Sequence, residues 1–432
     1  MVLTIVLAST TVLSMTGAVL IKPYINVGKF KLGLYWLICL AGALLMLLFG
    51  CIRFDAVISG ITANTSVNPL KILTLFISVT ILSIYLGDAG FFDYVADRIF
   101  LKSKGGQLKL FLILYAVVSV LTIFTSNDII ILTFTPPICI FAKKAKISPL
   151  PFLFGEFVAA NTWSMMLIIG NPTNIYLATA WGINFIDYLK VMAIPTIFAG
   201  LVELLIMYFL FKKQLKTPLN YNGEEVKIKD KPSLIIGLAH LGLCLITLVI
   251  SSYVDLPMWI ICFAFAISLI IFSTAFSLYQ KKPLKPLTNT AKRLPWDLIP
   301  FVLSMFIIVL ALNKQGVTEI ISSFLGDKNV IFSYGYTSYL ACNLINNIPM
   351  SVLYSTIPNM SATLNMQAVY STIIGSNIGA FLTPIGALAG IMFTGLVTKH
   401  NVKYSFKTFI LYGIIISVPT ISTALLTLTL MI

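Results

Sequence analysis

Polar residues that could bind an ion or a small solute interrupt an otherwise apolar stretch at 122–137, "TIFTSNDIIILTFTPP". Ser126, Asn127 and Asp128 stand side by side, and a proline doublet follows. Serine and asparagine offer side-chain oxygens, and a turn exposes backbone carbonyls as further ligands. Non-helical backbone is tolerated inside a membrane only where protein surrounds it or a wet cavity adjoins it. The stretch therefore predicts a binding turn at the tip of a re-entrant hairpin.

Two acids near this turn are candidates for coupling transport to an ion gradient. An ionisable side chain inside a membrane is costly and is a functional hypothesis by default. We predict Asp128, at the tip, as the proton- or cation-coupling acid. Glu156, in the apolar run before Gly170, is the second candidate; the alternative is a structural partner for Asn161 or for a break in the backbone. Glu203 is expected to face a neighbouring helix.

The composition requires a membrane. Hydrophobic residues make up 58% of the 432 and charged residues only 10%, against about 25% charged in soluble domains. Apolar stretches near the spanning length of about 20 residues recur, as at 2–21, 32–52, 234–251 and 259–279. The six cysteines are scattered singly, without the spacing of a metal site or a disulfide framework. These features predict an all-α multi-pass membrane protein whose first apolar stretch is retained as a helix.

The formal net charge of +14 is explained by membrane topology, and nucleic acid is not an expected partner. With the N-terminus outside and a hairpin turning at Asn127, 24 basic residues fall on the cytoplasmic side and 5 outside. This asymmetry follows the positive-inside rule. A single crossing at 108–141 would reverse every later loop and destroy it.

An internal repeat is visible at three places. The segment 87–100 has a counterpart at 313–326, Ser126-Asn127 has one in Asn346-Asn347, and "GNPTN" at 170–174 is answered by "GSNIGAFLTPIG" at 375–386. The topology gives the two copies opposite orientations. We predict N-terminal helices at 1–80, a first inverted repeat at 81–211, a linker with two helices at 212–296, and a second repeat at 297–432. The hairpin tips fall near 126–128 and 346–347. We expect the two tips to approach each other at the bilayer midplane, with Asn127 and Asn347 in contact and Asn377 completing the site.

Inverted repeats with paired interruptions of apolar helices are the sequence pattern of secondary transporters, with the site at the bilayer midplane. An ion channel is the competing class, although broken helices in inverted pairs favour alternating access. A nucleophile–base pairing or metal spacing is not apparent and only two histidines exist, so an enzyme is not expected. Without an ATP-binding motif, the driving force is expected from an ion gradient or a separate ATPase subunit.

The motifs "SND" with a following "TP", "GNPTN", "INNIP" and "GSNIGAFLTPIGALA", in this order, resemble the arsenite-permease (ArsB-like) branch of the ion transporter superfamily. That superfamily also contains NhaD-type sodium/proton antiporters and divalent anion/sodium symporters for dicarboxylates. The resemblance covers residues 81 to 432. It implies ten to eleven transmembrane helices plus two re-entrant hairpins, scaffold and transport domains that move as an elevator, and a homodimer.

The resemblance also implies the binding residues. They are Ser126, Asn127, Asp128, Gly170, Asn171, Thr173, Asn174, Asn346, Asn347, Ser376, Asn377, Gly379 and Thr383. A sodium site is expected at Ser126, Asn127 and Gly170, and no cofactor is expected other than sodium or a proton as coupling ion.

The expected function is transport of a small anion, an oxyanion or a metalloid across a bacterial plasma membrane, coupled to protons or sodium. A sodium/proton antiporter and a dicarboxylate or citrate symporter are the alternatives within the transporter class.

Overall fold

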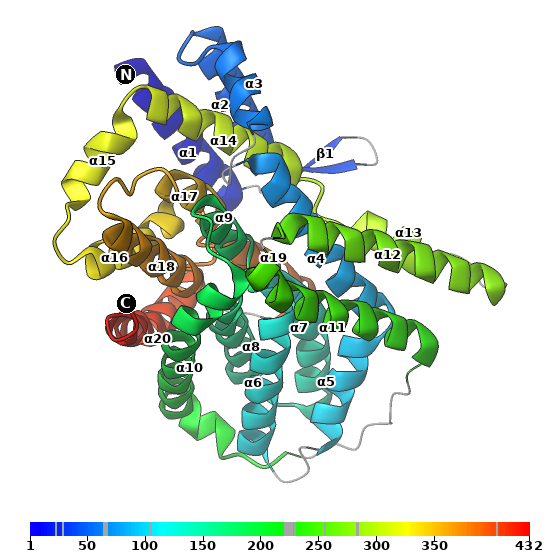
Figure 1. Ribbon diagram of the computed structural model, residues 1–432. Helices are drawn as coiled ribbons and strands as arrows, with labels where there is room; N and C mark the ends of the chain where they lie inside the picture. Colours follow the sequence, from blue (N-terminus) through cyan, green and yellow to red (C-terminus); the bar gives the residue numbers. More distant parts are fainter. Residues whose placement is uncertain are drawn as a thin grey trace.

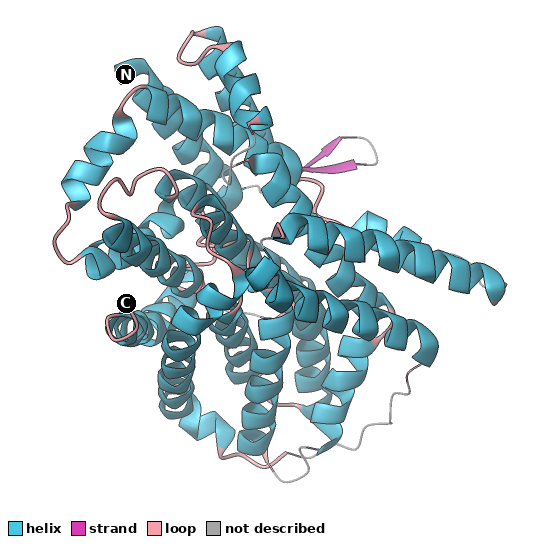
Figure 2. Ribbon diagram, viewed as in Figure 1, coloured by secondary structure: helices cyan, strands magenta, loops and turns pink. Residues whose placement is uncertain are grey.

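A computed structural model describes residues 1–21, 24–27, 30–63, 68–102, 106–219, 228, 230–254, 256–281, 285–402 and 405–432. Within these residues the protein is helical apart from one two-stranded antiparallel hairpin (Figure 2). The strands β1 (Tyr24–Val27) and β2 (Phe30–Gly33) pair from Tyr24 opposite Gly33 to Val27 opposite Phe30.

Long apolar helices follow from the composition, since a helix satisfies its own backbone hydrogen bonds in a membrane. Six described helices are long and apolar enough to span, and the pair formed by α14 (Leu298–Lys314) and α15 (Val317–Leu325) would add a seventh with a bend of 79°. The N-terminal group contains α1 (Val2–Ile21), α2 (Leu34–Leu48) and the amphipathic α3 (Phe54–Thr62). Helix α2 packs against both α1 and α14.

Seven helices follow in the first half. They are α4 (Pro69–Asp88), α5 (Phe91–Lys102), α6 (Gln107–Phe124), α7 (Asn127–Ala145), α8 (Leu150–Trp163), α9 (Pro172–Ala180) and α10 (Phe185–Leu215). Two short 3₁₀ turns, η1 (Ser164–Met166) and η2 (Ile168–Gly170), separate α8 from α9.

Three helices link the halves: α11 (Lys231–Val254), α12 (Met258–Tyr279) and α13 (Lys285–Arg293). Residues 220–227 and 229 of the predicted linker lie outside the described residues. Helices α11 and α12 pack on each other and on α4, and Figure 1 shows them extending to one side of the molecule.

The second half repeats the order of the first. Its helices are α14 (Leu298–Lys314), α15 (Val317–Leu325), α16 (Val330–Ile345), α17 (Asn347–Tyr354), α18 (Ala362–Gly379), α19 (Leu388–Lys399) and α20 (Phe406–Leu428). In each half a span is followed by a short helix that begins after a glycine, α5 after α4 and α15 after α14. A break of two residues then divides α6 from α7, and a break of one residue divides α16 from α17. A longer break divides α8 from α9 and α18 from α19.

The two halves are interlocked. Helix α7 of the first half packs against α19 of the second, and α17 of the second packs against α9 of the first. The long helices α10 and α20 lie against each other. Within each half the first hairpin arm packs on the broken helix, α6 on α8 and α16 on α18, as Figure 1 shows for the second pair.

Pairing α6 with α7 and α16 with α17 as hairpins leaves ten crossings. Eight are single helices, α1, α2, α4, α10, α11, α12, α14 and α20, and two are the broken pairs α8/α9 and α18/α19. The all-α multi-pass arrangement is confirmed. The number of ten to eleven spans and the two re-entrant hairpins stay predictions, since six described helices, or seven with the bent pair, are long and apolar enough to span.

Candidate substrate site at the two broken helices

Asn377 joins the two broken helices. It lies on the last turn of α18 and is fully buried. Its Oδ1 accepts a hydrogen bond from Asn171 Nδ2 at 2.9 Å and lies 3.0 Å from Ser164 Oγ. Its Nδ2 donates to Asn174 Oδ1 at 2.7 Å and to the Ile373 carbonyl at 2.8 Å. One amide therefore connects residues more than 200 positions apart, as the repeat predicted for the two motifs.

The break between α8 and α9 is held by its own side chains. Asn171 caps α9, with Oδ1 accepting from the backbone N–H and the hydroxyl of Thr173, both at 3.1 Å. Asn174 Nδ2 donates back across the turn to the Ser164 carbonyl at 2.9 Å. A Cβ on Gly170 would lie 2.2 Å from Ser164 O, so only glycine permits this close approach. The four predicted residues of "GNPTN" thus shape and bridge the break.

The first hairpin tip contacts the end of α8. Asn127 begins α7, and its Nδ2 donates to Asn161 Oδ1 at 3.1 Å. Asn127 Oδ1 accepts from the backbone N–H of Asp128 at 2.9 Å. Asn161 and Ser164 lie on the same turn, so the tip is connected through them to Asn377.

The second tip contacts the break between α18 and α19. Asn346 has a positive φ of 69°, caps α17 through Oδ1, and donates from Nδ2 to the Ile385 carbonyl at 3.0 Å. The backbone N–H of Asn347 donates to Gly386 O at 3.0 Å. Thr383 donates from its N–H and its hydroxyl to Asn343 Oδ1, at 3.1 and 2.7 Å.

Gly379 has a packing role in this arrangement. A Cβ there would lie 2.5 Å from Cys342 Sγ and 2.7 Å from the Tyr339 carbonyl, so glycine lets α18 approach α16. The Gly379 carbonyl accepts from Asn343 Nδ2 at 3.0 Å. Asn343 therefore ties the end of α18 to the loop containing Thr383.

Three predicted residues carry buried oxygens without a hydrogen-bond partner: Ser126 Oγ, Asn347 Oδ1 and Ser376 Oγ. Each of the three residues is at most 3% exposed. Buried polar atoms are normally hydrogen-bonded, so an unpaired one calls for an explanation such as a ligand, an ion or water. These atoms belong to the two hairpin tips and to the residue before Asn377, so they are candidates to bind a solute or an ion at this site.

The candidate acids differ in their surroundings. Asp128 is half-buried on the first turn of α7, where the positive end of a helix dipole favours an anionic side chain. Glu156 is fully buried, and both of its carboxyl oxygens lie 3.0 Å from the Thr135 hydroxyl. The side chain of Asn161 does not hydrogen-bond Glu156 as the alternative expected. It donates to the Phe157 carbonyl and accepts from Asn127.

The recorded hydrogen bonds connect each tip to a helix break, and no bond between the tips themselves is recorded among the described residues. The sequence predicted instead that Asn127 and Asn347 would be contacting groups. Ser164 and Asn343 were missed as bridging residues. Both stand in apolar runs beside a predicted motif but belong to none of the motifs.

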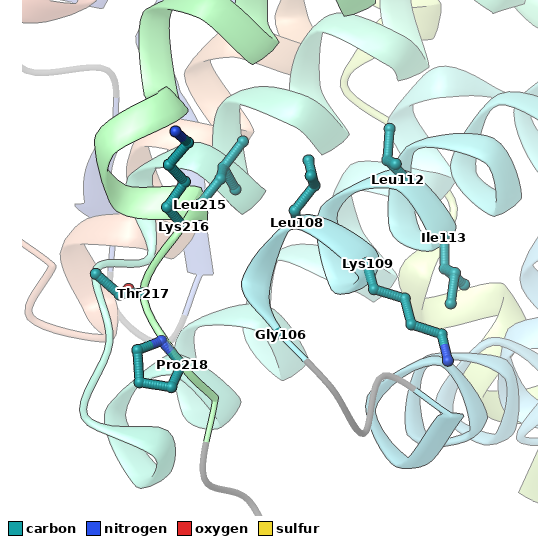
Figure 3. A pocket seen from close by; sticks show the side chains of 9 residues that line it. All are labelled: Gly106, Leu108, Lys109, Leu112, Ile113, Leu215, Lys216, Thr217 and Pro218. Carbon is teal, nitrogen blue, oxygen red and sulfur yellow. The ribbon is translucent and has the colours of Figure 1, made fainter.

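A surface pocket of about 760 Å³ lies away from these residues (Figure 3). It is formed by the start of α6, from Gly106 to Ile113, and by the end of α10, from Leu215 to Pro218. Because none of the predicted binding residues lines it, it is not the candidate substrate site. Among the described residues, no three His, Cys, Asp or Glu side chains gather as a metal site.

The citrate transporter family model, CitMHS, matches residues 34–374. The chain belongs to the CitMHS family. Members of this family are membrane transporters within the ion transporter superfamily, so the protein is a secondary transporter and not an enzyme. This agrees with the prediction made from the paired broken helices.

Relatives and one solved structure match nearly the whole length of this CitMHS-family protein. An arsenical pump membrane protein of Escherichia coli is 26% identical over 417 residues, covering 92% of this chain and 94% of the relative. A putative arsenical pump membrane protein of Bacillus subtilis is 25% identical, covering 90% and 92%. The crystal structure of the Alcanivorax borkumensis YdaH transporter shares the fold, with a TM-score of 0.52 at 13% identity, covering 99% and 96%.

Proposed function

We propose that the protein moves a small oxyacid or oxyanion of trivalent arsenic or antimony, coupled to protons or sodium. Several relatives that match most of the chain are described as arsenical pump membrane proteins, which supports this substrate class. The observation that carries the proposal is the chemistry of the site, where buried amides bridge the two broken helices and three of the predicted residues have a buried oxygen without a hydrogen-bond partner.

Uncharged polar groups suit an uncharged polyhydroxy solute. The charged side chains buried in the described part of the chain are Glu156 and Glu203, and both are acids. A trianion would meet no buried lysine or arginine there. Arsenous acid is neutral at neutral pH and carries three hydroxyls, each able to donate to an oxygen and accept from an amide. Ser126 Oγ, Asn347 Oδ1 and Ser376 Oγ supply such oxygens.

Citrate or another carboxylate is the second candidate, favoured by the family description and by four half-helix N-termini. Helices α7, α9, α17 and α19 all begin at the breaks and tips. Helix N-termini present N–H groups and partial positive charge to anions. A carboxylate would also need cations. The oxygen-rich group of Ser126, Asn127 and Gly170 would suit a sodium ion, a hard cation, with Ser126 Oγ free to coordinate it.

Transport is proposed to follow an elevator mechanism. The hairpins and broken helices of both halves would move together as a transport domain against a scaffold that includes α1, α2, α4 and α14. We place the N-terminus outside a bacterial plasma membrane, from the asymmetry of 24 against 5 basic residues. A homodimer, and an association with a separate ATPase subunit, complete the proposal.

Flux in inside-out vesicles tests the substrate. Wild-type protein is expected to accumulate arsenite and antimonite when a proton or sodium gradient is imposed, and to leave citrate and succinate at background. Asn377→Ala, which breaks the bridge between the halves, is the inactive control. Citrate uptake without arsenite uptake would replace the first candidate by the second.

A further inference from the structure

A second buried carboxyl cluster lies outside the candidate substrate site. Glu203, in the middle of α10, is fully buried. Its Oε1 lies 2.7 Å from the hydroxyl of Tyr115 on α6, and its Oε2 contacts the hydroxyl of Thr162 on α8. The sequence predicted only that Glu203 would face a neighbouring helix.

The hydrogen bonds of the Tyr115 hydroxyl determine whether the Glu203 carboxyl is ionised. The Tyr115 oxygen lies 2.6 Å from the Gly200 carbonyl and 2.7 Å from Glu203 Oε1, and it accepts from Trp163 Nε1 at 3.0 Å. A phenol has one proton to donate. The Gly200 carbonyl can only accept, and an ionised Glu203 could only accept as well. One of the two short oxygen–oxygen contacts would then contain no proton.

A protonated Glu203 resolves the conflict. Tyr115 donates to the Gly200 carbonyl, and Glu203 donates from Oε1 to the Tyr115 oxygen, which also accepts from Trp163. Thr162 donates to Oε2. Every short contact in the cluster then contains one hydrogen.

The surroundings favour the neutral acid. A buried ionised carboxylate is costly unless it is paired with a positive group. Helices α6, α8, α11 and α20 and the turns η1 and η2 pack against α10. Tyr115 is the titratable group that bonds Glu203. His240 on α11 bonds Ile236 O and Ser268, and Glu156 on α8 faces Thr135.

The other titratable side chains of these packed elements lie elsewhere. Cys244 contacts Cys262, and Tyr412 packs against Phe154 and Phe211. The rest stand near helix ends: Lys109, Lys231, Tyr253 and Lys407.

The cluster is built by a close approach of three helices. A Cβ on Gly200 would lie 2.5 Å from the Trp163 ring, so glycine allows the indole to reach the Tyr115 hydroxyl. Thr162 and Trp163 share one helical turn with Asn161 and Ser164, which contact Asn127 and Asn377. A change at the break between α8 and α9 therefore changes the groups that hold the Glu203 proton.

We propose that Glu203 is a proton-binding site: it holds a proton in this conformation, through Tyr115 and Thr162, and releases it when the end of α8 moves during transport. The proton-binding part rests on the geometry of the cluster alone. The release part rests on the proposed transport function and on no property of the substrate.

Infrared spectroscopy of the full-length protein in lipid tests the bound proton. The wild type at neutral pH is expected to show a carboxylic acid C=O band that is lost in Glu203→Gln and kept in the matched variant Glu156→Gln. Glutamine imitates the protonated acid, since its NH₂ donates to Tyr115 and its oxygen accepts from Thr162. Thermal stability close to the wild type is therefore expected for Glu203→Gln.

Tyr115→Phe provides a second test that does not depend on Glu203→Gln folding. Removing the phenol oxygen takes away the acceptor of the acid hydrogen, so the same band is expected to shift. A spectrum unchanged by both substitutions would overturn the proton site. In vesicles, Glu203→Gln is expected to lose accumulation driven by a pH gradient while still exchanging external for internal arsenite; retained accumulation would overturn the release step. If the wild type carries no arsenite, the substrate proposal fails and the infrared band still decides the proton site.

Discussion

At the scale of single residues, the candidate site contains asparagine side chains in which the amide oxygen and the amide nitrogen cannot exchange places. Asn377 accepts through Oδ1 from Asn171 and donates through Nδ2 to Asn174 and to the Ile373 carbonyl. All these partners are buried, so none can turn to water if its bond is lost. The polarity of one side chain therefore fixes the geometry in which the two broken helices meet.

Asn377→Asp tests this polarity with a nearly isosteric change. One carboxylate oxygen would still accept from Asn171, whereas the other would face the Asn174 Oδ1 and Ile373 carbonyl acceptors. An unpaired buried group costs about 1–3 kcal/mol, so apparent substrate affinity is expected to fall about tenfold or more. Flux assays over a range of substrate concentrations measure this. Unchanged affinity and thermal stability would mean that the bridge is not needed.

Asp128→Asn tests the predicted coupling acid. The amide keeps the size of the side chain at the start of α7 and removes its charge. Transport driven by an ion gradient is expected to be abolished, with expression and thermal stability close to the wild type, because Asp128 is half-buried and its side chain is not needed to cap the helix. If accumulation against a gradient persists, the coupling acid is another residue, with Glu156 the next to substitute.

At the scale of elements, the breaks in α8/α9 and α18/α19 rely on backbone contacts that side chains would block. Gly170→Ala would place a methyl group 2.2 Å from the Ser164 carbonyl. We expect displacement of the break, loss of transport and a lowered unfolding temperature. Gly242→Ala is the matched control, because its Cβ would meet no atom within 4 Å on helix α11. Equal behaviour of the two variants in flux and thermal assays would remove the break from the mechanism.

How much of these elements the sequence could predict depended on where the polar residues stood. Asn171, Asn174 and Asn377 were identified because they belong to the motifs "GNPTN" and "GSNIGAFLTPIG" that carry the family resemblance, and the structure brings them together. Their partners could not be identified in the same way. Ser164 and Asn343 meet the motifs only after η1 and the turn at 380–387 have formed, and hydrophobic periodicity carries no signal for such non-helical backbone. For the same reason the sequence could not predict that each hairpin tip bonds to a helix break.

At the scale of the whole molecule, two contacts join segments far apart in the sequence, and the side of the membrane on which each lies stays a prediction. The N-terminal amine donates to Gln315 Oε1 at 2.8 Å, and Arg293 pairs with Asp88. The first pair was predicted outside and the second inside. Single cysteines at Lys146 and Lys328, on a cysteine-free background, are expected to react with an impermeant thiol reagent from the cytoplasmic and the external face respectively. Reaction of both from one face would exclude the hairpin at 126–128.

The bonds from Asn171 and Asn174 to Asn377 also bear on how the protein is made. They span 206 and 203 residues, so the ribosome synthesises the first two amides long before their partner exists. Until the second half is inserted, the polar turn after α8 lacks its hydrogen-bond partner Asn377 inside the bilayer. Non-helical backbone exposed to lipid is strongly disfavoured. The nascent first half must therefore wait beside the insertion machinery or sit shallowly at the membrane surface. Truncated chains ending before α18 should then be substrates for membrane quality-control proteases, whatever solute the finished protein carries.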